Sequence, residues 1–454
     1  MTSSLVGSEM CIRDRDNLVY LLNVRMSGIK SIKNEIRLDF YKKTVDKNFD
    51  PDKFRVKAIY GENGSGKTAI ITGIKIFQDL MLSNQYLNES KNQRFLDEII
   101  NKETSRFTFG CEYITGEEES YIVYDYNFEL EKNNKGDYVI KHESLNLKNG
   151  NYPNNNYVNV YECDNGELIN INCNETVKNI IEKKTFNLLN KNPFMSLYIV
   201  DYTSVIEKDK EFSYNIAVML FLIALINVYI NEEDKHDIYF LRKTIRESHE
   251  KSSEYINDIN EILDTISVYS GFDDNSISKS EFDKYKESVK QLTKFIQIFK
   301  RELKSIDIDA KDDGDNYRCE LIFNYGNYKV NKEFESTGIK KLVRLYSAFK
   351  AANNYGIAFV DEMDSNINDI YLCKLIEYFM YYGKGQLCFT MHNVDPMSLL
   401  KQNKNSIDFL SSDNKIVSWV SKGHASPENY YKNGMIENSP FNIDATDFIG
   451  IFEG

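Results

Sequence analysis

The sequence predicts an α/β fold, and three features of the chain lead to that prediction. Apolar, strand-like segments end at a glycine-rich loop near residue 61 and at polar junctions near residues 361 and 391. Segments with helical periodicity follow the first two of these junctions. Between them, residues 107–147 alternate apolar and polar side chains, which predicts an antiparallel β lobe. At 454 residues the chain is long enough for two or three units, each with its own core.

The composition is typical of a soluble globular protein, with 42% hydrophobic and 28% charged residues. A net charge of −13 provides no basic field over the whole chain, so binding to nucleic acid would need a local patch. The seven cysteines are scattered without a C-x-x-C pair, which suits reduced thiols in a cytoplasm. The longest apolar run, Ile216 to Ile230, is short for a bilayer span, and we expect a buried helix there. A cytoplasmic location is therefore expected.

The first sixteen residues are excluded from the fold prediction. They contain Ser4-Leu-Val-Gly-Ser-Glu-Met-Cys-Ile-Arg-Asp-Arg15, which resembles a translated sequencing adaptor of the kind found fused to metagenomic gene predictions. We expect the native chain to begin near Leu18.

A phosphate-binding loop is predicted after the strand Val56 to Tyr60. The strand leads into Gly61-Glu62-Asn63-Gly64-Ser65-Gly66-Lys67-Thr68, and a segment of helical periodicity follows over residues 69–82. This is the strand, loop and helix order of a P-loop. The glycines let several backbone N–H groups converge on one anion, and the start of the helix adds its positive dipole end. Lys67 supplies a cation to the β- and γ-phosphates, and the Thr68 hydroxyl is placed to ligate Mg²⁺. The alternative is a chance match in an unrelated loop.

The remaining pattern divides the chain into consecutive ranges. Residues 17–175 are expected to form an N-terminal nucleotide-binding lobe, in which Leu18–Met26 and Glu35–Phe40 pair as a hairpin beside the P-loop strand. Residues 176–312 are expected to be a helical insert, with a helical hairpin formed by residues 255–269 and 282–303. An equally weighted alternative to the hairpin is that these are two ordinary amphipathic helices, each packed on the main body. Residues 313–454 are expected to form a C-terminal lobe. Its expected elements are strands at 317–323, 328–334, 356–360, 386–390, 406–410 and 415–420, with helices at 339–353 and 369–382.

Polar residues that suit phosphate chemistry follow the strands of this last lobe. Asp361 and Glu362 end a buried strand; Asp361 can hold Mg²⁺ through its water shell, and Glu362 can accept a proton from an attacking water. The alternative is that Asp361 and Glu362 have no chemical role and only mark the point where a core strand reaches solvent. Without a P-loop, that alternative would be the commoner one. Ser336 and Gly338 place a hydroxyl and a glycine at a helix N-terminus, a second anion-binding arrangement. His392 follows another core strand, in a position to sense a γ-phosphate, although a single histidine is more often structural.

Taken in order, these four motifs resemble the ABC-type ATPases of the SMC and OLD (overcoming-lysogenization-defect) group. In particular they are similar to the OLD-like AAA-family ATPases of prokaryotic anti-phage systems, including PARIS and abortive-infection modules. The resemblance covers Leu18 to Leu82 and Phe334 to Val420. It implies a P-loop NTPase of ABC-ATPase type, with an antiparallel β lobe and an inserted helical hairpin.

The resemblance also implies a mechanism in which two heads sandwich ATP. Lys67, Thr68 and Asp361 of one head face Ser336 and Gly338 of the other. Glu362 then activates water, His392 contacts the γ-phosphate, and the loop Asp364-Ser365-Asn366 communicates across the dimer.

Some residues depart from the family pattern. Asn368 stands where relatives often have histidine, and Met391 replaces a common threonine. The signature motif Ser336-Thr-Gly338 is not the full Leu-Ser-Gly-Gly of transporters, which argues against a transporter head. ATPases of this type also have a glutamine-loop residue, and Gln78, Gln85 and Gln93 are all candidates for it. No Toprim nuclease domain fits after Thr390, so an effector nuclease or toxin is expected to be a separate polypeptide.

The resulting expectation is an ATPase that uses ATP and Mg²⁺ and whose nucleotide-driven head dimerisation gates an effector, in anti-phage defence. Its partners are a second copy of itself, a separate nuclease or toxin, and possible nucleic acid; no membrane is expected. One alternative is an SMC-like DNA-repair ATPase that binds DNA directly, which the helical hairpin favours and the charge of −13 opposes. Another is an ATP-gated scaffold that hydrolyses nucleotide negligibly.

Overall fold

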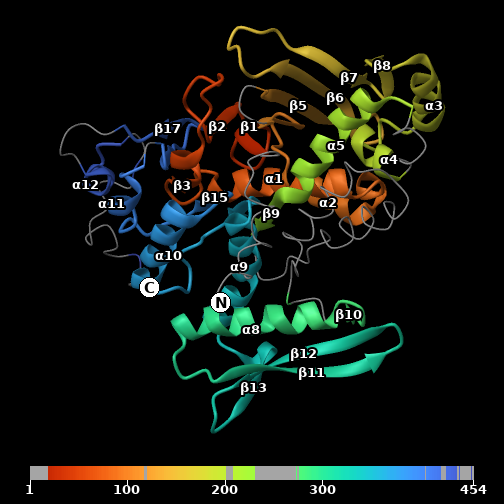
Figure 1. Ribbon diagram of the computed structural model, residues 1–454. Helices are drawn as coiled ribbons and strands as arrows, with labels where there is room; N and C mark the ends of the chain where they lie inside the picture. Colours follow the sequence, from red (N-terminus) through yellow and green to blue (C-terminus); the bar gives the residue numbers. More distant parts are fainter. Residues whose placement is uncertain are drawn as a thin grey trace, which may run out of the picture. The chain divides into compact units, whose positions relative to one another are not determined.

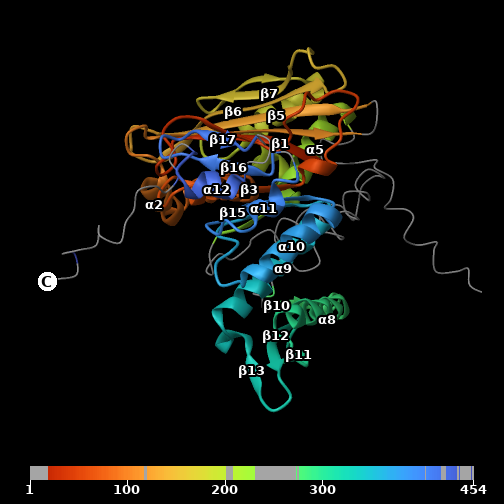
Figure 2. The same ribbon diagram turned by 90° about the vertical axis from the view of Figure 1, so that its left-hand side faces the viewer.

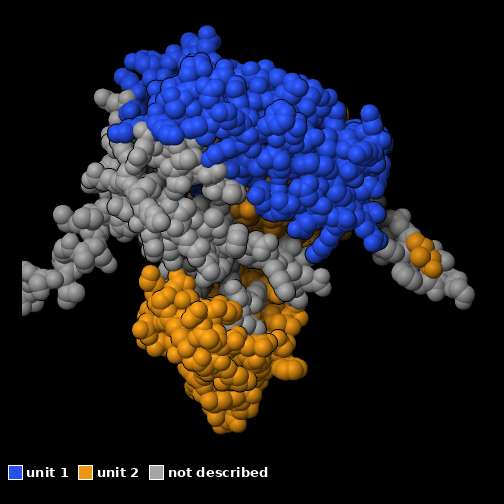
Figure 3. Space-filling model, turned by 90° about the vertical axis from the view of Figure 1, so that its right-hand side faces the viewer, with its two compact units in different colours: residues 1–28, 37–52, 83–222 blue, residues 29–36, 53–82, 223–454 orange. Residues whose placement is uncertain are grey.

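The computed structural model describes residues 19–116, 120–200, 208–230, 276–403, 405–420 and 426–436, together with residues 272, 439 and 451. The chain forms two compact units, coloured separately in Figure 3, that interleave along the sequence. Unit 1 holds Met1–Gly28, Arg37–Asp52 and Ser83–Leu222; unit 2 holds Ile29–Ile36, Lys53–Leu82 and Ile223–Gly454. Neither unit coincides with one of the consecutive ranges expected from the sequence. Among the described residues, no helix combines the length and apolar character needed to cross a membrane.

Unit 1 is built on a seven-stranded sheet with the order β2-β1-β4-β5-β6-β7-β8 (Figure 1). The pairs from β1–β4 through β7–β8 are antiparallel, which confirms the antiparallel lobe predicted from the alternating pattern. The strands are β1 (Tyr20–Ser27), β2 (Ile36–Asp39), β4 (Arg106–Thr115), β5 (Ile122–Lys132), β6 (Tyr138–Asn149), β7 (Val158–Asp164) and β8 (Glu167–Ile171).

Helices of unit 1 pack on one face of this sheet through aromatic side chains at alternate strand positions. Tyr113 of β4 and Tyr124 of β5 are buried and stack in parallel, with ring centroids 5.1 Å apart. Their hydroxyls donate to the Met219 sulfur at 3.3 Å and to Asn215 Oδ1 at 2.8 Å, and both acceptors lie on α5. The helical segments are η2 (Tyr86–Asn88), α2 (Ser90–Ile99), α3 (Glu175–Thr185), α4 (Phe194–Val200) and α5 (Lys210–Leu225).

A carboxyl group lies inside this core. Glu143 of β6 is 1% exposed and accepts hydrogen bonds from the hydroxyls of Tyr161 at 2.8 Å and Tyr126 at 3.2 Å. Its other oxygen accepts the backbone N–H of Phe194, the first residue of α4, at 2.7 Å. Burial raises the pKa of Glu143 to about 7, although these hydrogen bonds act in the opposite direction. Glu143 therefore ties the start of α4 to the sheet through a group that titrates near neutral pH.

The apolar run Ile216 to Ile230 is not one buried helix, so that prediction is wrong over its last part. Helix α5 ends at Leu225, and β9 (Ile226–Tyr229) follows at once. β9 pairs in parallel with β14, with Ile226 opposite Ile357. A run that is apolar on all sides carries no period to mark the change from helix to strand. The expected helical insert therefore contains a strand of the sheet of unit 2.

Unit 2 is built on a six-stranded sheet with the order β17-β16-β3-β15-β14-β9. β16, β3, β15, β14 and β9 run in parallel, and the edge strand β17 pairs antiparallel with β16. β3, β9, β14, β15 and β16 are buried along their whole length, as expected of parallel strands covered on both faces. Besides β9 the strands are β3 (Val56–Tyr60), β14 (Ile357–Val360), β15 (Gln386–Thr390), β16 (Ile407–Leu410) and β17 (Ile416–Ser418), which confirms those expected strands.

The expected opening hairpin is placed differently. β1 and β2 are neighbours, as predicted, but they belong to the sheet of unit 1, whereas the P-loop strand β3 belongs to the sheet of unit 2. β1 instead takes β4 as its other neighbour, with Val24 opposite Cys111. Local alternation predicts a strand but does not determine its partner, which the tertiary fold selects.

The helices of unit 2 confirm three predicted helical segments, one after the P-loop, one before the strand that ends at Val360 and one after it. Helix α1 spans Lys67–Leu82, α9 spans Thr337–Asn353, and α10 spans Asp369–Tyr382. Shorter elements complete the unit, namely η1 (Asp52–Phe54), α11 (Met397–Leu400) and α12 (Pro427–Lys432).

A helix and a small sheet precede α9. Figures 1 and 2 show α8 (Phe282–Phe299) beside β11 and β12. The apolar side chains of α8, including Val289, Leu292 and Ile296, join the buried cluster that also contains Leu345 of α9. α8 therefore packs on the main body. Its expected hairpin partner, residues 255–269, lies outside the described residues, as do the first eighteen residues and most of the C-terminal tail. The small sheet comprises β10 (Ser276–Ser278), β11 (Ser305–Asp313), β12 (Asn316–Asn324) and β13 (Lys329–Asn331), followed by η4 (Lys332–Phe334).

Candidate functional site

Three parallel strands of unit 2 end side by side, and each is followed by one of the predicted motifs. β15 lies between β3 and β14, with Thr390 opposite Ile59 and Val360 opposite Phe389. The P-loop follows β3, Asp361 follows β14, and His392 follows β15. Ligands of open parallel sheets bind at the carboxyl ends of the strands. The fold therefore brings together motifs that are more than 300 residues apart in sequence, since Gly61 and His392 flank the same sheet edge.

The backbone of the P-loop requires its glycines. Gly64 and Gly66 have φ values of 81° and 109°, which side-chain residues rarely adopt. At Gly61 a Cβ would lie 2.5 Å from the carbonyl oxygen of Leu410, so the close approach of β16 requires glycine there. Helix α1 begins at Lys67, directly after these turns. Its first N–H groups therefore face the loop, where they can bind an anion.

The Lys67 ammonium is held by two carbonyl groups of the P-loop. Its Nζ donates to the carbonyl oxygens of Gly61 at 2.7 Å and Glu62 at 2.9 Å. Burial lowers the pKa of Lys67, and the charges of Asp361, Glu362 and Asp364 act in the opposite direction. The ammonium group is therefore within electrostatic reach of the residues that follow β14.

Two polar atoms at this edge are buried without a hydrogen-bond partner among the described residues. They are Oγ of Ser65, in the P-loop, and Oδ1 of Asp364, after β14. Buried polar atoms in folded proteins are otherwise almost always paired with protein or bound groups. A hydroxyl in a glycine-rich loop before a helix suits a phosphate group, and a free carboxylate oxygen suits a hydrated cation. The neighbouring Thr68 is half-buried in the first turn of α1, and Asn63 is exposed. The residues present therefore fit Mg²⁺ and a nucleoside triphosphate.

The two acids after β14 are joined by one hydroxyl. Asp361 is 4% exposed, and the Thr390 hydroxyl donates to its Oδ1 at 2.5 Å. The same Thr390 oxygen accepts the backbone N–H of Glu362 at 2.8 Å. Glu362 has a φ of 46°, in the left-handed region, and its side chain is exposed. Non-glycine residues held in this region often belong to functional sites, where the surrounding contacts maintain the strain.

The carboxylate of Asp364 holds the turn that carries His392. Its Oδ2 accepts the backbone N–H groups of His392 at 2.8 Å and Asn393 at 2.6 Å. The His392 side chain is exposed at the same sheet edge. Nearby, the Tyr60 hydroxyl donates to the Met391 sulfur at 2.9 Å. Met391, which departs from the family pattern, thus binds the last residue of the P-loop strand.

The signature residues lie at a helix N-terminus, as predicted. Ser336 is the N-cap of α9, and its side chain accepts the backbone N–H of Ile339 at 3.4 Å. At Gly338 a Cβ would lie 2.9 Å from the carbonyl oxygen of Asn366, so α9 contacts the loop after β14 closely. Asn368, the other departure from the pattern, is the N-cap of α10 and accepts the N–H of Ile370.

Sequence analysis does not identify Lys30, which the structure places beside the P-loop. Lys30 has a φ of 48° in the short segment that follows β1, and this segment belongs to unit 2. The neighbouring Ile32 would meet a Cβ at Gly66 at 3.0 Å. The Lys30 side chain is exposed; partial desolvation lowers its pKa, and the charge of Asp361 acts in the opposite direction. A second cation therefore lies within electrostatic reach of the predicted metal-binding carboxylate, although no sequence motif marks it.

Two of the three candidate glutamines hold the fold together. Gln78 is buried and donates to the carbonyl oxygen of Ile226 at 2.7 Å. Gln93 bonds both backbone groups of Tyr138, at 3.0 Å and 2.8 Å. Gln85 is exposed and accepts a hydrogen bond from the Asn88 amide at 3.3 Å.

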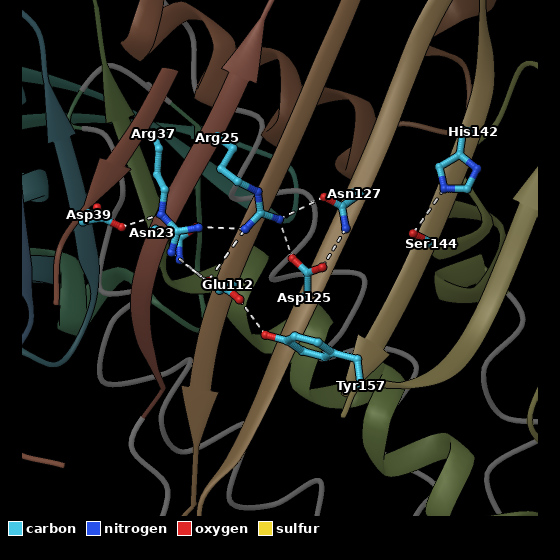
Figure 4. Close-up of polar contacts among 10 residues, drawn as sticks. All are labelled: Asn23, Arg25, Arg37, Asp39, Glu112, Asp125, Asn127, His142, Ser144 and Tyr157. Carbon is cyan, nitrogen blue, oxygen red and sulfur yellow. Dashed lines mark hydrogen bonds and ion pairs between the residues drawn. The ribbon is translucent and has the colours of Figure 1, made fainter. Parts of the chain in front are cut away.

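A separate polar cluster covers a face of the unit 1 sheet (Figure 4). Arg25 of β1 pairs with Asp125 of β5 and lies 3.8 Å from Glu112 of β4. Glu112 also accepts from Arg37 at 3.1 Å and from the Tyr157 hydroxyl at 2.5 Å. Burial raises the pKa of Glu112, but these hydrogen bonds and cations lower it overall. Because its charges bind one another across the strands, we assign this cluster a structural role.

No protein-family model matches the chain, and no curated protein matches it. The functional assignment therefore depends on the geometry described above and on the resemblance of the four motifs.

Proposed function

We propose that this protein binds and hydrolyses ATP as an ABC-type ATPase, and that nucleotide-driven pairing of two copies gates a separate effector in anti-phage defence. The observation that carries the ATPase assignment is the position of Lys67. Its ammonium lies at the carboxyl edge of a parallel sheet, within electrostatic reach of Asp361, Glu362 and Asp364. A cation in a glycine-rich loop, together with acids that follow another strand of the same sheet, is the arrangement that phosphoryl transfer to water requires.

Each residue has a distinct part in the proposed reaction. Lys67 exchanges its bonds to the Gly61 and Glu62 carbonyls for bonds to β- and γ-phosphate oxygens. The N–H groups of the loop and of the first turn of α1 orient the phosphate chain. Thr68 and Asp361 are the residues that would hold Mg²⁺, which supplies positive charge to the phosphates when bound.

Glu362 acts on the water. Its carboxylate accepts a proton as the water oxygen bonds to the γ-phosphorus and the bond to the ADP oxygen breaks. The products are ADP and phosphate. Since the protein forms no covalent bond in this scheme, catalysis depends on positioning and electrostatic stabilisation.

Two variants test the ATPase assignment. Lys67→Ala is expected to abolish binding of a fluorescent ATP analogue, because the phosphates lose their principal cation. Glu362→Gln is expected to bind the analogue as the wild type does and to lose turnover by roughly 10²- to 10⁴-fold, the range for a general base. Normal hydrolysis by Glu362→Gln would remove the general-base role. A purified wild type with no affinity for magnesium nucleotide would refute the assignment altogether.

Pairing of two copies is tested with the same slow variant. Glu362→Gln is expected to form dimers by light scattering only when Mg-ATP is present. Ser336→Arg, which places a long cation at the exposed N-cap of α9, is expected to bind nucleotide as a monomer and to prevent pairing. A Glu362→Gln protein that stays monomeric with saturating Mg-ATP would refute the paired-head mechanism.

The defence role rests on the resemblance of the motifs, and it has its own test. Expression of the protein together with the product of an adjacent nuclease or toxin gene is expected to protect cells from phage, and Lys67→Ala is expected to abolish protection. ATP-dependent DNA binding by the isolated protein that weakens steeply with salt would favour direct action on DNA instead.

A further inference from the structure

Lys341 lies in the second turn of α9 and is 3% exposed. Its Nζ donates to the carbonyl oxygen of Glu362 at 2.6 Å and to that of Ser365 at 2.9 Å, and it also bonds Ser365 Oγ. All three acceptors belong to the loop between β14 and α10. An ammonium group with three donors is thus matched by three oxygens of a single loop.

Simple packing does not account for a lysine at this position. Lysine is among the residues most rarely buried, because its charge loses hydration unless partners replace water. An apolar residue in the second turn of α9 would fill the core at lower cost, as neighbouring Leu342 and Val343 do. A buried lysine that bonds three oxygens of one loop is instead suited to fixing the conformation of that loop.

The loop in question carries the residues on which the proposed chemistry depends. Glu362, whose carbonyl Lys341 binds, has the left-handed φ of 46° and supplies the proposed general base. Asp364 of the same loop holds the turn of His392 through two backbone N–H groups. Helix α9, which carries Lys341, has Ser336 as its N-cap, and its Gly338 lies close to the carbonyl of Asn366 in this loop.

We infer that Lys341 is a positioning residue that couples the N-terminus of α9 to the orientation of Glu362. This inference rests on the proposed ATPase function and extends it. A displacement of α9, such as a second copy bound at Ser336 produces, is transmitted through Lys341 to the backbone of Glu362. Lys341 does not touch the nucleotide in this scheme. Its loss is expected to affect the turnover number and to leave nucleotide binding unchanged.

The first test compares Lys341→Met with Lys350→Met. Methionine fills similar volume but donates no hydrogen bonds, and Lys350 lies in the last turn of the same helix, away from the loop. Lys341→Met is expected to lower kcat by roughly 10- to 100-fold, the effect of misplacing a catalytic group by about 1 Å. The dissociation constant for Mg-ATP is expected to stay within about threefold of wild type. Lys350→Met is expected to match the wild type in both quantities.

The second test uses Ser365→Ala, a smaller change that removes one acceptor of Lys341 and retains the carbonyls. It is expected to lower kcat by roughly two- to tenfold, the effect of one hydrogen bond. In the double variant Lys341→Met/Ser365→Ala, kcat is expected to equal that of Lys341→Met, because the two side chains act through the same contact. If Lys341→Met fails to fold, an unchanged kcat in Ser365→Ala overturns the inference.

Other outcomes separate the inference from the proposed function. A folded Lys341→Met protein with wild-type kcat overturns the coupling role while the ATPase assignment stands. Equal losses of nucleotide binding and turnover also overturn it, because they indicate general support of the site. A wild type that neither binds nor hydrolyses ATP overturns both.

Discussion

Thr390 donates a hydrogen bond to Asp361 at 2.5 Å, and the Thr390 oxygen also accepts the backbone N–H of Glu362 at 2.8 Å. A single hydroxyl on β15 therefore fixes both acids that follow β14, the proposed metal ligand and the proposed general base. Thr390 is fully buried, so water cannot substitute for these two bonds. The position of this hydroxyl gives the first prediction.

Replacing Thr390 with valine, which has nearly the same shape, is expected to lower kcat by roughly 10- to 100-fold, because Asp361 and Glu362 both lose a partner. It is also expected to destabilise unit 2 by about 1–3 kcal/mol, since buried polar groups are left unpaired. Steady-state ATPase assays at varied Mg²⁺ and denaturant unfolding measure the two effects.

Thr390→Ser is the matched control because it retains the hydroxyl and removes one methyl group. It is expected to keep turnover within a fewfold of wild type. Equal turnover in the valine and serine variants would show that the hydroxyl has no part in orienting the two acids.

Lys30 gives a prediction about affinity. Its charge lies close to that of Asp361, on the segment that contacts the P-loop, so Lys30→Met is expected to weaken binding of Mg-ATP roughly tenfold. Titration with a fluorescent ATP analogue measures the change. Lys33→Met removes the same charge from the same segment, where both lysines are exposed, and is expected to bind as the wild type does. Equal affinities in the two variants would contradict a specific role for Lys30.

Glu143 gives a prediction about pH. Its pKa in the folded protein is about 7, above the ordinary value of 4.5, so the folded state binds the proton more tightly than the unfolded state does. The protonated form therefore stabilises unit 1 fully below pH 4.5, and this contribution is lost as the pH rises through about 7. The difference amounts to about 3 kcal/mol. Wild-type stability is expected to decrease between pH 5 and pH 8 in denaturant unfolding.

Glu143→Gln mimics the protonated carboxyl group at every pH. Its amide oxygen can accept the Phe194 N–H, and the Tyr126 and Tyr161 hydroxyls can rotate to accept from its NH₂ group. The variant is expected to be more stable than wild type at pH 8 and to lose this part of the pH dependence. Glu162→Gln, on neighbouring β7, is the control. It measures how the loss of a half-buried carboxylate changes the free energy of unfolding. A Glu143→Gln protein that is less stable than wild type at pH 8 would contradict the prediction.

The parts of the fold that the sequence predicts correctly are those marked by local physics. β3 and β14 are short apolar runs that end at a glycine and at an acid, β15 is a short run that ends just before Met391 and His392, and α10 has the predicted bounds. The alternation of β4 to β6 predicts an antiparallel sheet because its two faces differ in polarity. The expected residues around the P-loop then meet because parallel strands end at one edge.

The parts that the sequence does not predict depend on distant partners. β9 follows α5 within one apolar run, and only its pairing with β14 distinguishes strand from helix. β1 pairs with β4 through contacts that local alternation does not specify. Lys30 belongs to no motif. Lys341 lies just after the Ser336 to Gly338 signature and Thr390 two residues before His392, but their polar partners come from segments remote in sequence, which no motif specifies.

The interleaving of the two units has a consequence for experiments on either one. The chain passes from one unit to the other after residues 28, 36, 52, 82 and 222. The segment Lys53–Leu82, which contains the whole P-loop, is therefore attached at both ends to strands and helices of unit 1. A fragment that begins at Ile223 retains β14, β15 and α9 but lacks the phosphate loop. Unfolding of the antiparallel sheet releases both ends of that segment, so a substitution in unit 1 can reduce nucleotide affinity without touching a single residue of the site.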